Sequence, residues 1–295
     1  MKGSLMLDRR SFLSLAAAGL SVTALVGCGG SPDASDDAPA SDTTTEAEDE
    51  AGTGAVDTGK LIVGFDSSYP PYGYVGDDGE YTGFDLELAQ EVAARNDWEV
   101  QLEPIDWDAK DTMLDSGAIN CIWNGFTMEG REDDYTFSEP YMINGQVIVV
   151  RADSGIASFD DLAGKAVITQ VDSAAYNVLA GEDATQAELA ATFAGLETIG
   201  EYNTAFMQLE SGAVDAVACD LSIAAYQLAA KPDAYVQLDE FLSEEHYAVG
   251  FKKGDDATAD AVNEALRAMD EEGFVQELCD KYAEDGISYD NWCLA

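Results

Sequence analysis

Short apolar runs alternate with amphipathic stretches along the chain from residue 61 onward. Residues 61–65 are an apolar run that predicts a strand, and Phe84, Leu88 and Val92 recur near helical spacing and predict a helix over 84–96. The pattern then predicts strands over 98–104, 118–123 and 146–151, and a helix over 108–116. Strands and helices that alternate in this way are typical of α/β layers with parallel strands.

A second cycle of the same kind begins near residue 159, with strands predicted over 166–170 and 213–219 and a helix over 205–211. The segments 114–122 and 209–217 echo each other, since each combines a helix end, a glycine and then a strand. The two strands end near Asn124 and Asp220, where polar side chains gather. Two α/β lobes with facing strand ends form a cleft, which is the usual ligand position in open α/β sheets.

The first 59 residues do not follow this pattern. Arg9 and Arg10 precede an apolar run over 12–26 that is short for a bilayer span, so residues 1–27 are predicted to be an export signal, by the twin-arginine or the general secretory route. Residues 25–28 resemble the bacterial lipobox, in which Cys28 is lipidated; the alternative is a simple secretory peptide. Residues 29–59 hold nine acidic residues and no Lys or Arg. We therefore expect 28–59 to be a lipid-anchored, solvated linker.

Charge narrows the classes of partner. The 58 acidic and 14 basic residues give a net charge of −44 at pH 7, which argues against binding to nucleic acid or to anionic lipid head groups. Such a surface is either adapted to salt or favours cationic solutes. The 46% hydrophobic content is enough to build proper cores.

Cysteine and histidine offer little chemistry. Cys121 and Cys219 lie in apolar, strand-like runs and are predicted to be buried, whereas Cys279 and Cys293 are close enough in sequence to form a disulfide. No Cys-x-x-Cys spacing favours zinc. His246 is the one histidine in the chain, so a structural or surface role is preferred to a triad or a metal site.

Carboxylates, aromatic rings, a small polar loop and an arginine follow the ends of the predicted elements between residues 64 and 131, where binding groups tend to lie. Five motifs resemble, in order, the solute-binding proteins that deliver polar amino acids to ABC importers: YPPY at 69–72, GFDL at 83–86, WDA at 107–109, FSEPY at 137–141 and VDAV at 214–217. The resemblance runs from residue 61 to about 282.

The resemblance implies an α/β fold of the type II periplasmic-binding-protein kind, with two α/β lobes, a two-strand hinge and a ligand cleft between the lobes. The strands should cross near 146–150 and 246–249. Lobe one then comprises 60–150 and 246–295, and lobe two comprises 151–245. The implied protein is a lipid-anchored monomer on the outer face of the cell membrane. It needs no cofactor, closes on a free amino acid and delivers it to an ABC permease.

By resemblance, Arg131 binds the α-carboxylate of the ligand, aided by the backbone N–H of Thr127 and by a helix start at Ser173 and Ala174. Asp220 binds the α-ammonium. The ligand's side chain is expected between aromatic rings. The remaining predicted contacts are Asp66, Tyr69, Trp107, Asn124 and Gly125.

Each assignment has an alternative. Arg131 precedes three acidic residues and could form a surface ion pair, and Asp220 could cap the helix that follows it. Tyr69 and Trp107 could belong to the core, and Tyr72 and Tyr74 suit the cleft or the core equally.

Asp172 stands where the family commonly has glycine. A carboxylate beside a carboxylate-binding helix start is unfavourable, so this side chain should point away from the ligand or the ligand should be cationic.

For the amino-acid receptor, Asp66 and Asp172 favour a cationic ligand such as lysine, arginine or histidine, and glutamine and cystine remain alternatives.

Two functions other than amino-acid delivery remain open. The same fold also supports a dehydratase acting on cyclic carboxylic acids, for which His246 or a carboxylate of raised pKa would have to be the general acid. The third possibility is a sensor that presents its closed lobes to a receptor.

Overall fold

The first sheet has the strand order β5-β1-β6-β13-β7 in a computed structural model that describes residues 59–294. Strand β1 is parallel to both β5 and β6, while β13 runs antiparallel between β6 and β7. The parallel pairing follows from the helices that connect these strands. The strands are β1 (Lys60–Phe65), β5 (Glu99–Pro104), β6 (Cys121–Ile122), β7 (Tyr135–Phe137) and β13 (Gly250–Lys252).

The second sheet has the order β10-β9-β11-β8-β12. Its parallel strands β10, β9 and β11 continue into an antiparallel pair, since β8 is antiparallel to both β11 and β12. These strands are β8 (Met142–Arg151), β9 (Ala166–Gln170), β10 (Gly195–Ile199), β11 (Ala216–Asp220) and β12 (Tyr235–Tyr247).

Helices cover both sheets, and a small three-stranded sheet lies beside α1. The small sheet consists of β2 (Ser68–Tyr69), β3 (Gly73–Val75) and β4 (Tyr81–Thr82). The helices are α1 (Phe84–Arg95), α2 (Lys110–Ser116), α3 (Ala174–Ala180), α4 (Ala187–Ala190), α5 (Tyr202–Ser211), α6 (Leu221–Ala230), α7 (Asp256–Glu271) and α8 (Phe274–Lys281).

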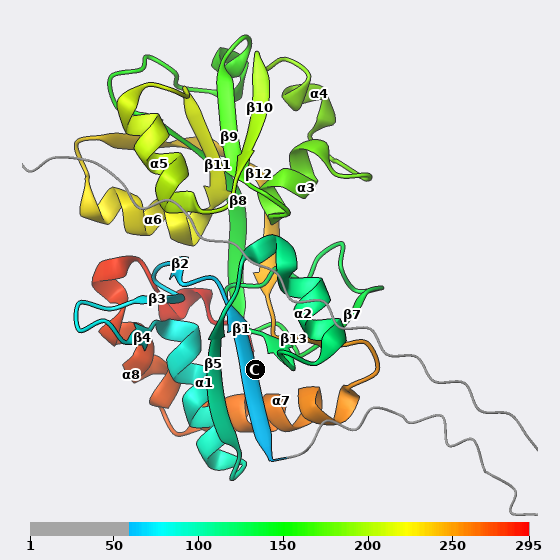
Figure 1. The fold of residues 1–295 in the computed structure, drawn as a ribbon. Helices are drawn as coiled ribbons and strands as arrows, with labels where there is room; N and C mark the ends of the chain where they lie inside the picture. Colours follow the sequence, from blue (N-terminus) through cyan, green and yellow to red (C-terminus); the bar gives the residue numbers. More distant parts are fainter. Residues whose placement is uncertain (1–58, 295) are drawn as a thin grey trace, which may run out of the picture. The chain divides into compact units, whose positions relative to one another are not determined.

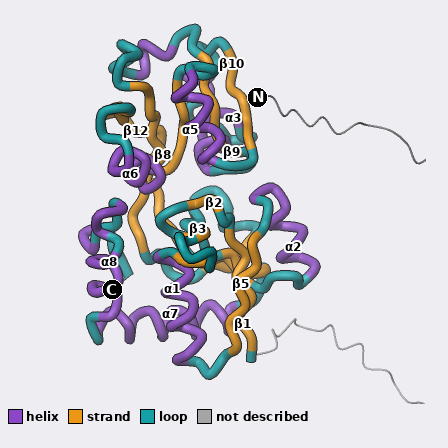
Figure 2. Tube along the Cα trace, turned by 60° about the vertical axis from the view of Figure 1, so that its left-hand side comes forward, coloured by secondary structure: helices purple, strands orange, loops and turns teal. Residues whose placement is uncertain are grey.

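Strands β8 and β12 connect the two sheets (Figures 1 and 2). The sequence placed the first crossing near 146–150, but these residues pair with β11 inside the second sheet. The crossing instead uses the start of β8, which pairs with the end of β12 from Met142↔Tyr247 to Gly145↔Glu244. Tyr247 also bridges to Thr127 of the loop after β6. The sequence missed this shift because an apolar β-branched run marks a buried strand but not the sheet to which it belongs.

The alternation of elements that the sequence predicted is confirmed. Strand β9 has the predicted bounds, and the predicted helix over 84–96 is α1 with one residue fewer. The predicted helix over 108–116 is a 3-10 turn, Trp107–Ala109, followed by α2. The echoed segments do share a geometry, since Gly117 and Gly212 end α2 and α5 with φ of 76° and 77°, a left-handed conformation that favours glycine.

Several sequence predictions concern the N-terminal or C-terminal regions. The export signal, Cys28 and the acidic linker lie outside the described residues. Within residues 59–294, no helix is both long and apolar enough to cross a bilayer. Cys279 is buried and is not joined to Cys293, whose Sγ lies 3.5 Å from the carbonyl oxygen of Pro140.

Asp85, at the start of α1, ties this helix to the loop after β6. Its buried carboxylate accepts the backbone N–H of Gly125 at 2.6 Å and the hydroxyl of Tyr141 at 2.8 Å. Burial raises the pKa of Asp85 from its usual 3.8 to about 7. The group therefore keeps its proton more readily in the folded than in the unfolded chain.

We expect Asp85→Asn to remove a pH dependence of stability. An acid whose pKa is raised on folding destabilises the fold as the pH rises from about 4 to 7, by up to roughly 4 kcal/mol here. Asparagine mimics the protonated acid, because its oxygen accepts from Gly125 and its N–H donates to the Tyr141 hydroxyl. Urea unfolding between pH 4 and 8 measures the slope, with the exposed Asp115→Asn as control. Equal slopes in wild type and Asp85→Asn would contradict the assignment.

Candidate functional site

A small, partly open cavity lies where the ends of β9 and β11 meet the loops after β1 and β6. Nine of the ten residues predicted to bind a ligand line it, and Gln170 joins them. Asp66 is the predicted residue that does not. The lining residues are Tyr69, Trp107, Asn124, Gly125, Thr127, Arg131, Gln170, Ser173, Ala174 and Asp220.

Arg131 is held with its guanidinium in the cavity wall. It is 8% exposed, donates from Nη1 to the carbonyl oxygen of Thr127 at 2.9 Å and lies 4.9 Å from the ring centre of Phe126. A second nitrogen, Nη2, lies 3.4 Å from the carbonyl oxygen of Asp172. Within residues 59–294 it forms no ion pair, so the surface ion pair considered from the sequence is absent. A buried guanidinium without a carboxylate is suited to an anionic ligand group.

The start of α3 lies in the wall that Arg131 also lines. Ser173 caps this helix, because its Oγ accepts the backbone N–H of Tyr176 at 3.1 Å. The N–H groups of a first helical turn have no partner within the helix. They add hydrogen-bond donors to the wall that contains the guanidinium.

Asp220 supplies the opposite charge. It ends β11, is 4% exposed, and its Oδ1 accepts from Gln146 at 2.6 Å, from Tyr247 at 3.0 Å and from Asn144 at 3.1 Å. Burial raises its pKa. Its side chain does not cap α6, although its backbone occupies the cap position. The predicted capping role is therefore not realised, and no lysine or arginine of the described chain pairs with this carboxylate.

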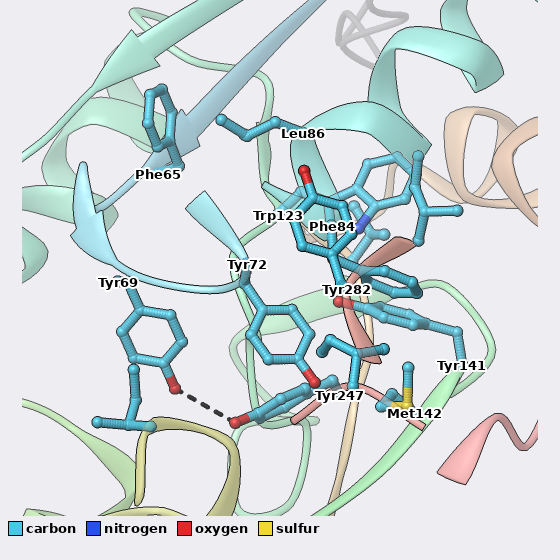
Figure 3. Close-up of a cluster of buried hydrophobic side chains, with 14 of the residues drawn as sticks. Phe65, Tyr69, Tyr72, Phe84, Leu86, Trp123, Tyr141, Met142, Tyr247 and Tyr282 are labelled. Carbon is cyan, nitrogen blue, oxygen red and sulfur yellow. Dashed lines mark hydrogen bonds between the residues drawn. The ribbon is translucent and has the colours of Figure 1, made fainter. Parts of the chain in front are cut away.

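Tyr69 and Trp107 belong to the core and also face the cavity. The Tyr69 hydroxyl lies 3.2 Å from that of Tyr247 (Figure 3). Trp107 packs edge-on against Phe126. Tyr72 is 2% exposed, packs edge-on against Tyr247 and does not line the cavity. Tyr74 does not line it either, so Tyr72 and Tyr74 serve packing.

The loop Asn124–Gly125 is held in place by contacts with the neighbouring loop after β1 and with two aromatic rings. The Asn124 side chain accepts the backbone N–H of Asp66 at 3.0 Å. Gly125 has φ of 56°, and a Cβ at this position would lie 3.0 Å from the Tyr69 ring and 3.1 Å from the Tyr247 ring. Both the conformation and the space favour glycine.

Two side-chain contacts join the second sheet to the loops of the first across the edge of the cavity. Asp66 lies in an adjoining groove, where its Oδ2 accepts the Gln170 amide at 2.7 Å. Asp172 has φ of 55° and forms an ion pair with Lys110, which is 2% exposed. Asp172 therefore turns toward this lysine, as its position beside the helix start requires.

Sequence reasoning missed three residues near the cavity. Gln170 ends a predicted strand, and the strand-end rule that identified Asp220 applies to it equally. The burial of Lys110 could not be predicted, because a lysine at a helix start is ordinarily exposed. Glu245 is 3% exposed, but the sequence does not indicate its burial, because it lies in a run of polar residues. Only the register of β12 against β8 turns its side chain inward.

His246 lies outside the cavity. Its side chain is 43% exposed and its Nδ1 lies 2.7 Å from Glu129. It does not line the cavity. Across residues 59–294, no three His, Cys, Asp or Glu side chains are grouped so as to hold a metal ion.

The fold and the cavity define a solute-binding protein of the type II periplasmic-binding-protein kind. The chain belongs to the bacterial extracellular solute-binding proteins, family 3, whose sequence profile matches residues 61–285.

Individual relatives cover most of the folded part. The L-cystine-binding protein TcyJ of Escherichia coli is 33% identical over 76% of this chain and 82% of its own length. The arginine-binding extracellular protein ArtP of Bacillus subtilis is 28% identical over 76% of this chain and 86% of its own. A substrate-binding protein from Streptococcus pneumoniae, solved with bound histidine, has a TM-score of 0.73 and 31% identity, and the match covers 78% of this chain and 94% of that one.

We expect Gly125→Ala to destabilise the protein more than Gly130→Ala. Both glycines have positive φ, of 56° and 77°, so each substitution strains the backbone by about 1 kcal/mol. Nothing lies within 4 Å of a Cβ at Gly130, whereas a Cβ at Gly125 meets two aromatic rings. Denaturant unfolding should show about 1 kcal/mol more loss for Gly125→Ala. Equal losses of unfolding free energy in the two variants would mean that the Tyr69 and Tyr247 rings move aside without destabilising the protein.

Proposed function

We propose that this protein binds a polar amino acid in the cavity and delivers it to an ABC importer. One observation carries the proposal. Arg131 and Asp220 are buried in the wall of one cavity, and neither is paired with an opposite charge of the described chain. Unpaired buried charges are costly, and a ligand with an α-carboxylate and an α-ammonium compensates both. Membership of the solute-binding family supports this assignment.

The buried charges favour a ligand with an additional positive charge. Asp66, Asp220 and Glu245 are at most 5% exposed, and Lys110 is engaged by Asp172. Among the residues that line the cavity and its two adjoining grooves, Arg131 is thus the one cation, and it faces three buried acids. A cationic side chain directed past Trp107 towards Asp66 would improve this balance. The arginine and histidine named for two of the relatives are consistent with it, whereas cystine, named for the third, carries a second carboxylate beside its second ammonium and so no additional net charge.

Closure of two lobes would bury the ligand. We place the hinge at residues 142–145 of β8 and 244–247 of β12, where the two strands run between the sheets. The lobe bounds predicted from the sequence, 60–150 with 246–295 and 151–245, differ from this placement by several residues at the first crossing and fall within it at the second. The Asp66–Gln170 and Lys110–Asp172 contacts join the lobes and would form on closure.

The N-terminal predictions complete the proposed function. Export, lipidation of Cys28 and an acidic linker from 28 to 59 would hold a monomeric receptor at the outer face of the membrane, beside its permease. The extracellular character of the family supports export.

We propose a binding role without catalysis. The dehydratase alternative requires a general acid that faces the ligand. His246 faces away from the cavity, whereas Asp220 and Glu245 are carboxylates of raised pKa near it. Incubation with prephenate or arogenate is therefore the direct check, and any loss of water from either substrate would overturn this part of the proposal.

We expect residues 60–295 to be stabilised by one class of amino acid in a thermal-shift screen of the twenty amino acids, ornithine and cystine. Arg131→Ala should weaken binding at least about 100-fold, because it removes a buried carboxylate partner. Arg131→Lys should weaken it too, since lysine lacks the planar fork. Arg267→Ala, at an exposed ion pair with Glu139, is the matched control. No shift with any amino acid would reject the proposed ligand class.

We expect Lys110 and Asp172 to be coupled in ligand binding. Lys110→Met should weaken affinity about fivefold, because the closed state loses an ion pair of about 1 kcal/mol. Asp172→Gly should also weaken it, because Lys110 is left buried without its partner. The double variant should lose less than the sum of the two effects, as titration calorimetry would show. Additive losses would mean that the pair does not contribute to closure.

A further inference from the structure

Two buried carboxylates share the same pair of amide donors at the hinge side of the cavity. The Asn144 amide donates to Oδ1 of Asp220 at 3.1 Å and to Oε1 of Glu245 at 2.7 Å. The Gln146 amide donates to the same two oxygens at 2.6 Å and 2.7 Å. The Thr127 hydroxyl donates to Oε1 of Glu245 at 2.9 Å, which links this carboxylate to a residue that lines the cavity.

The register of the hinge strands creates this arrangement. Glu245 pairs with Asn144 across β12 and β8, and Gln146 follows Asn144 on the same face of its strand. Asp220 ends β11 directly opposite Gln146. The side-chain nitrogen of Gln146 donates to both carboxylates, while its Oε1 is buried without a partner in the described chain.

Further charges around Glu245 are mostly negative. A groove of the cleft reaches Glu245 from the side of α3. Its other charged lining residues are Glu129, Arg131, Asp134, Glu182, Asp183 and Glu244. Arg131 is the one cation among them, and in the proposed function it is occupied by the ligand's carboxylate. No lysine or arginine in the described chain pairs with Asp220 or with Glu245.

Below neutral pH, two carboxylates that share the same donors in a buried site do not both ionise unless a cation joins them. We propose that Asp220 and Glu245 share one proton while the cleft is empty, and that a ligand ammonium arriving at Asp220 releases it to solvent. Glu245 is then a positioning residue of the ammonium site, which it reaches through Asn144, Gln146 and Thr127. This inference rests on the proposed function, and it adds that ligand capture is linked to proton release. Burial and the charge of Asp220 raise the pKa of Glu245 to about 7, in keeping with this geometry.

The proposed proton release predicts the direction in which ligand affinity depends on pH. The proton is held in the ligand-free protein below about pH 7 and is lost from the complex. Binding therefore becomes weaker as the pH falls, by up to tenfold per pH unit for one proton. Above about pH 8 the pair is already ionised, and affinity should no longer depend on this group.

Titration calorimetry in two buffers of different ionisation enthalpy counts the released protons. The probes are L-arginine and L-cystine at pH 6.5. Wild type should release about 0.5 to 1 proton per ligand bound. Glu245→Gln keeps the size of the side chain and its hydrogen-bonding oxygen but holds no proton, so the number of protons released per bound ligand should fall to near zero, whatever the affinity of the variant. Equal counts in the two proteins, or no release by wild type on binding, would overturn the proposal.

Two control variants separate other sources of protons. His246 adjoins Glu245 in sequence, and histidine commonly exchanges protons near neutral pH. Asp85 also has a pKa of about 7 but does not line the cavity. His246→Gln and Asp85→Asn should both retain the proton release of wild type, and its loss in either variant would reassign the proton.

A ligand-free measurement tests the shared proton by itself. Carbon-13 NMR of side-chain carboxyl groups should show a glutamate that titrates near pH 7 in wild type and is missing in Glu245→Gln. Its absence from wild type overturns the proposal whether or not a ligand binds. Failure of every amino acid to bind, with this resonance present, would reject the proposed function and leave the shared proton established.

Discussion

The antiparallel pairing of β8 with β12 is the constraint on which the rest of the structure depends. These strands connect the two sheets, and side chains alternate between their faces. Asn144 and Gln146 therefore face the cleft from β8, and Glu245 and Tyr247 face it from β12. A slip of one residue in β8 would bring Ile143 inward and turn Asn144 and Gln146, the two amide donors to Asp220, away from the cleft. The same strands thus join the sheets and build the charged wall of the cavity.

The cavity keeps unlike charges buried and apart. Asp220 is held by two amides and a tyrosine hydroxyl, and Arg131 by two carbonyl oxygens. Neutral dipoles of this kind fix the position of a charge without neutralising it. The charge therefore remains available to a ligand. A direct Arg131–Asp220 ion pair would satisfy both groups and leave the cavity with no electrostatic reason to bind a zwitterion.

The sequence predicted the alternation of strands and helices from local patterns, and most of the cavity wall from the resemblance to the amino-acid-binding family. Local patterns placed Asp220 at a strand end and the aromatic and polar motifs at element ends, while the roles of Tyr69, Trp107, Arg131 and Asp220 came from the resemblance. Glu245 and the exact crossing were missed for one reason. Both depend on the register between strands about 100 residues apart, which no local pattern encodes. The hydrogen bond from Gln170 to Asp66 was missed as well, because a position near a strand end does not specify which side chain lies across the cleft.

Lys110 and Asp172 show how two unusual residues can explain each other. Asp172 adopts φ of 55°, a conformation that is strained for a side chain with a Cβ, and it adds a negative charge near the start of α3. Lys110 is almost fully buried, which is rare for lysine without a partner. The ion pair satisfies the lysine and directs the carboxylate away from the helix start. Since the two residues come from opposite sides of the cleft, each is satisfied only when the sides meet. The pair therefore stabilises the closed arrangement without contributing to the cavity wall.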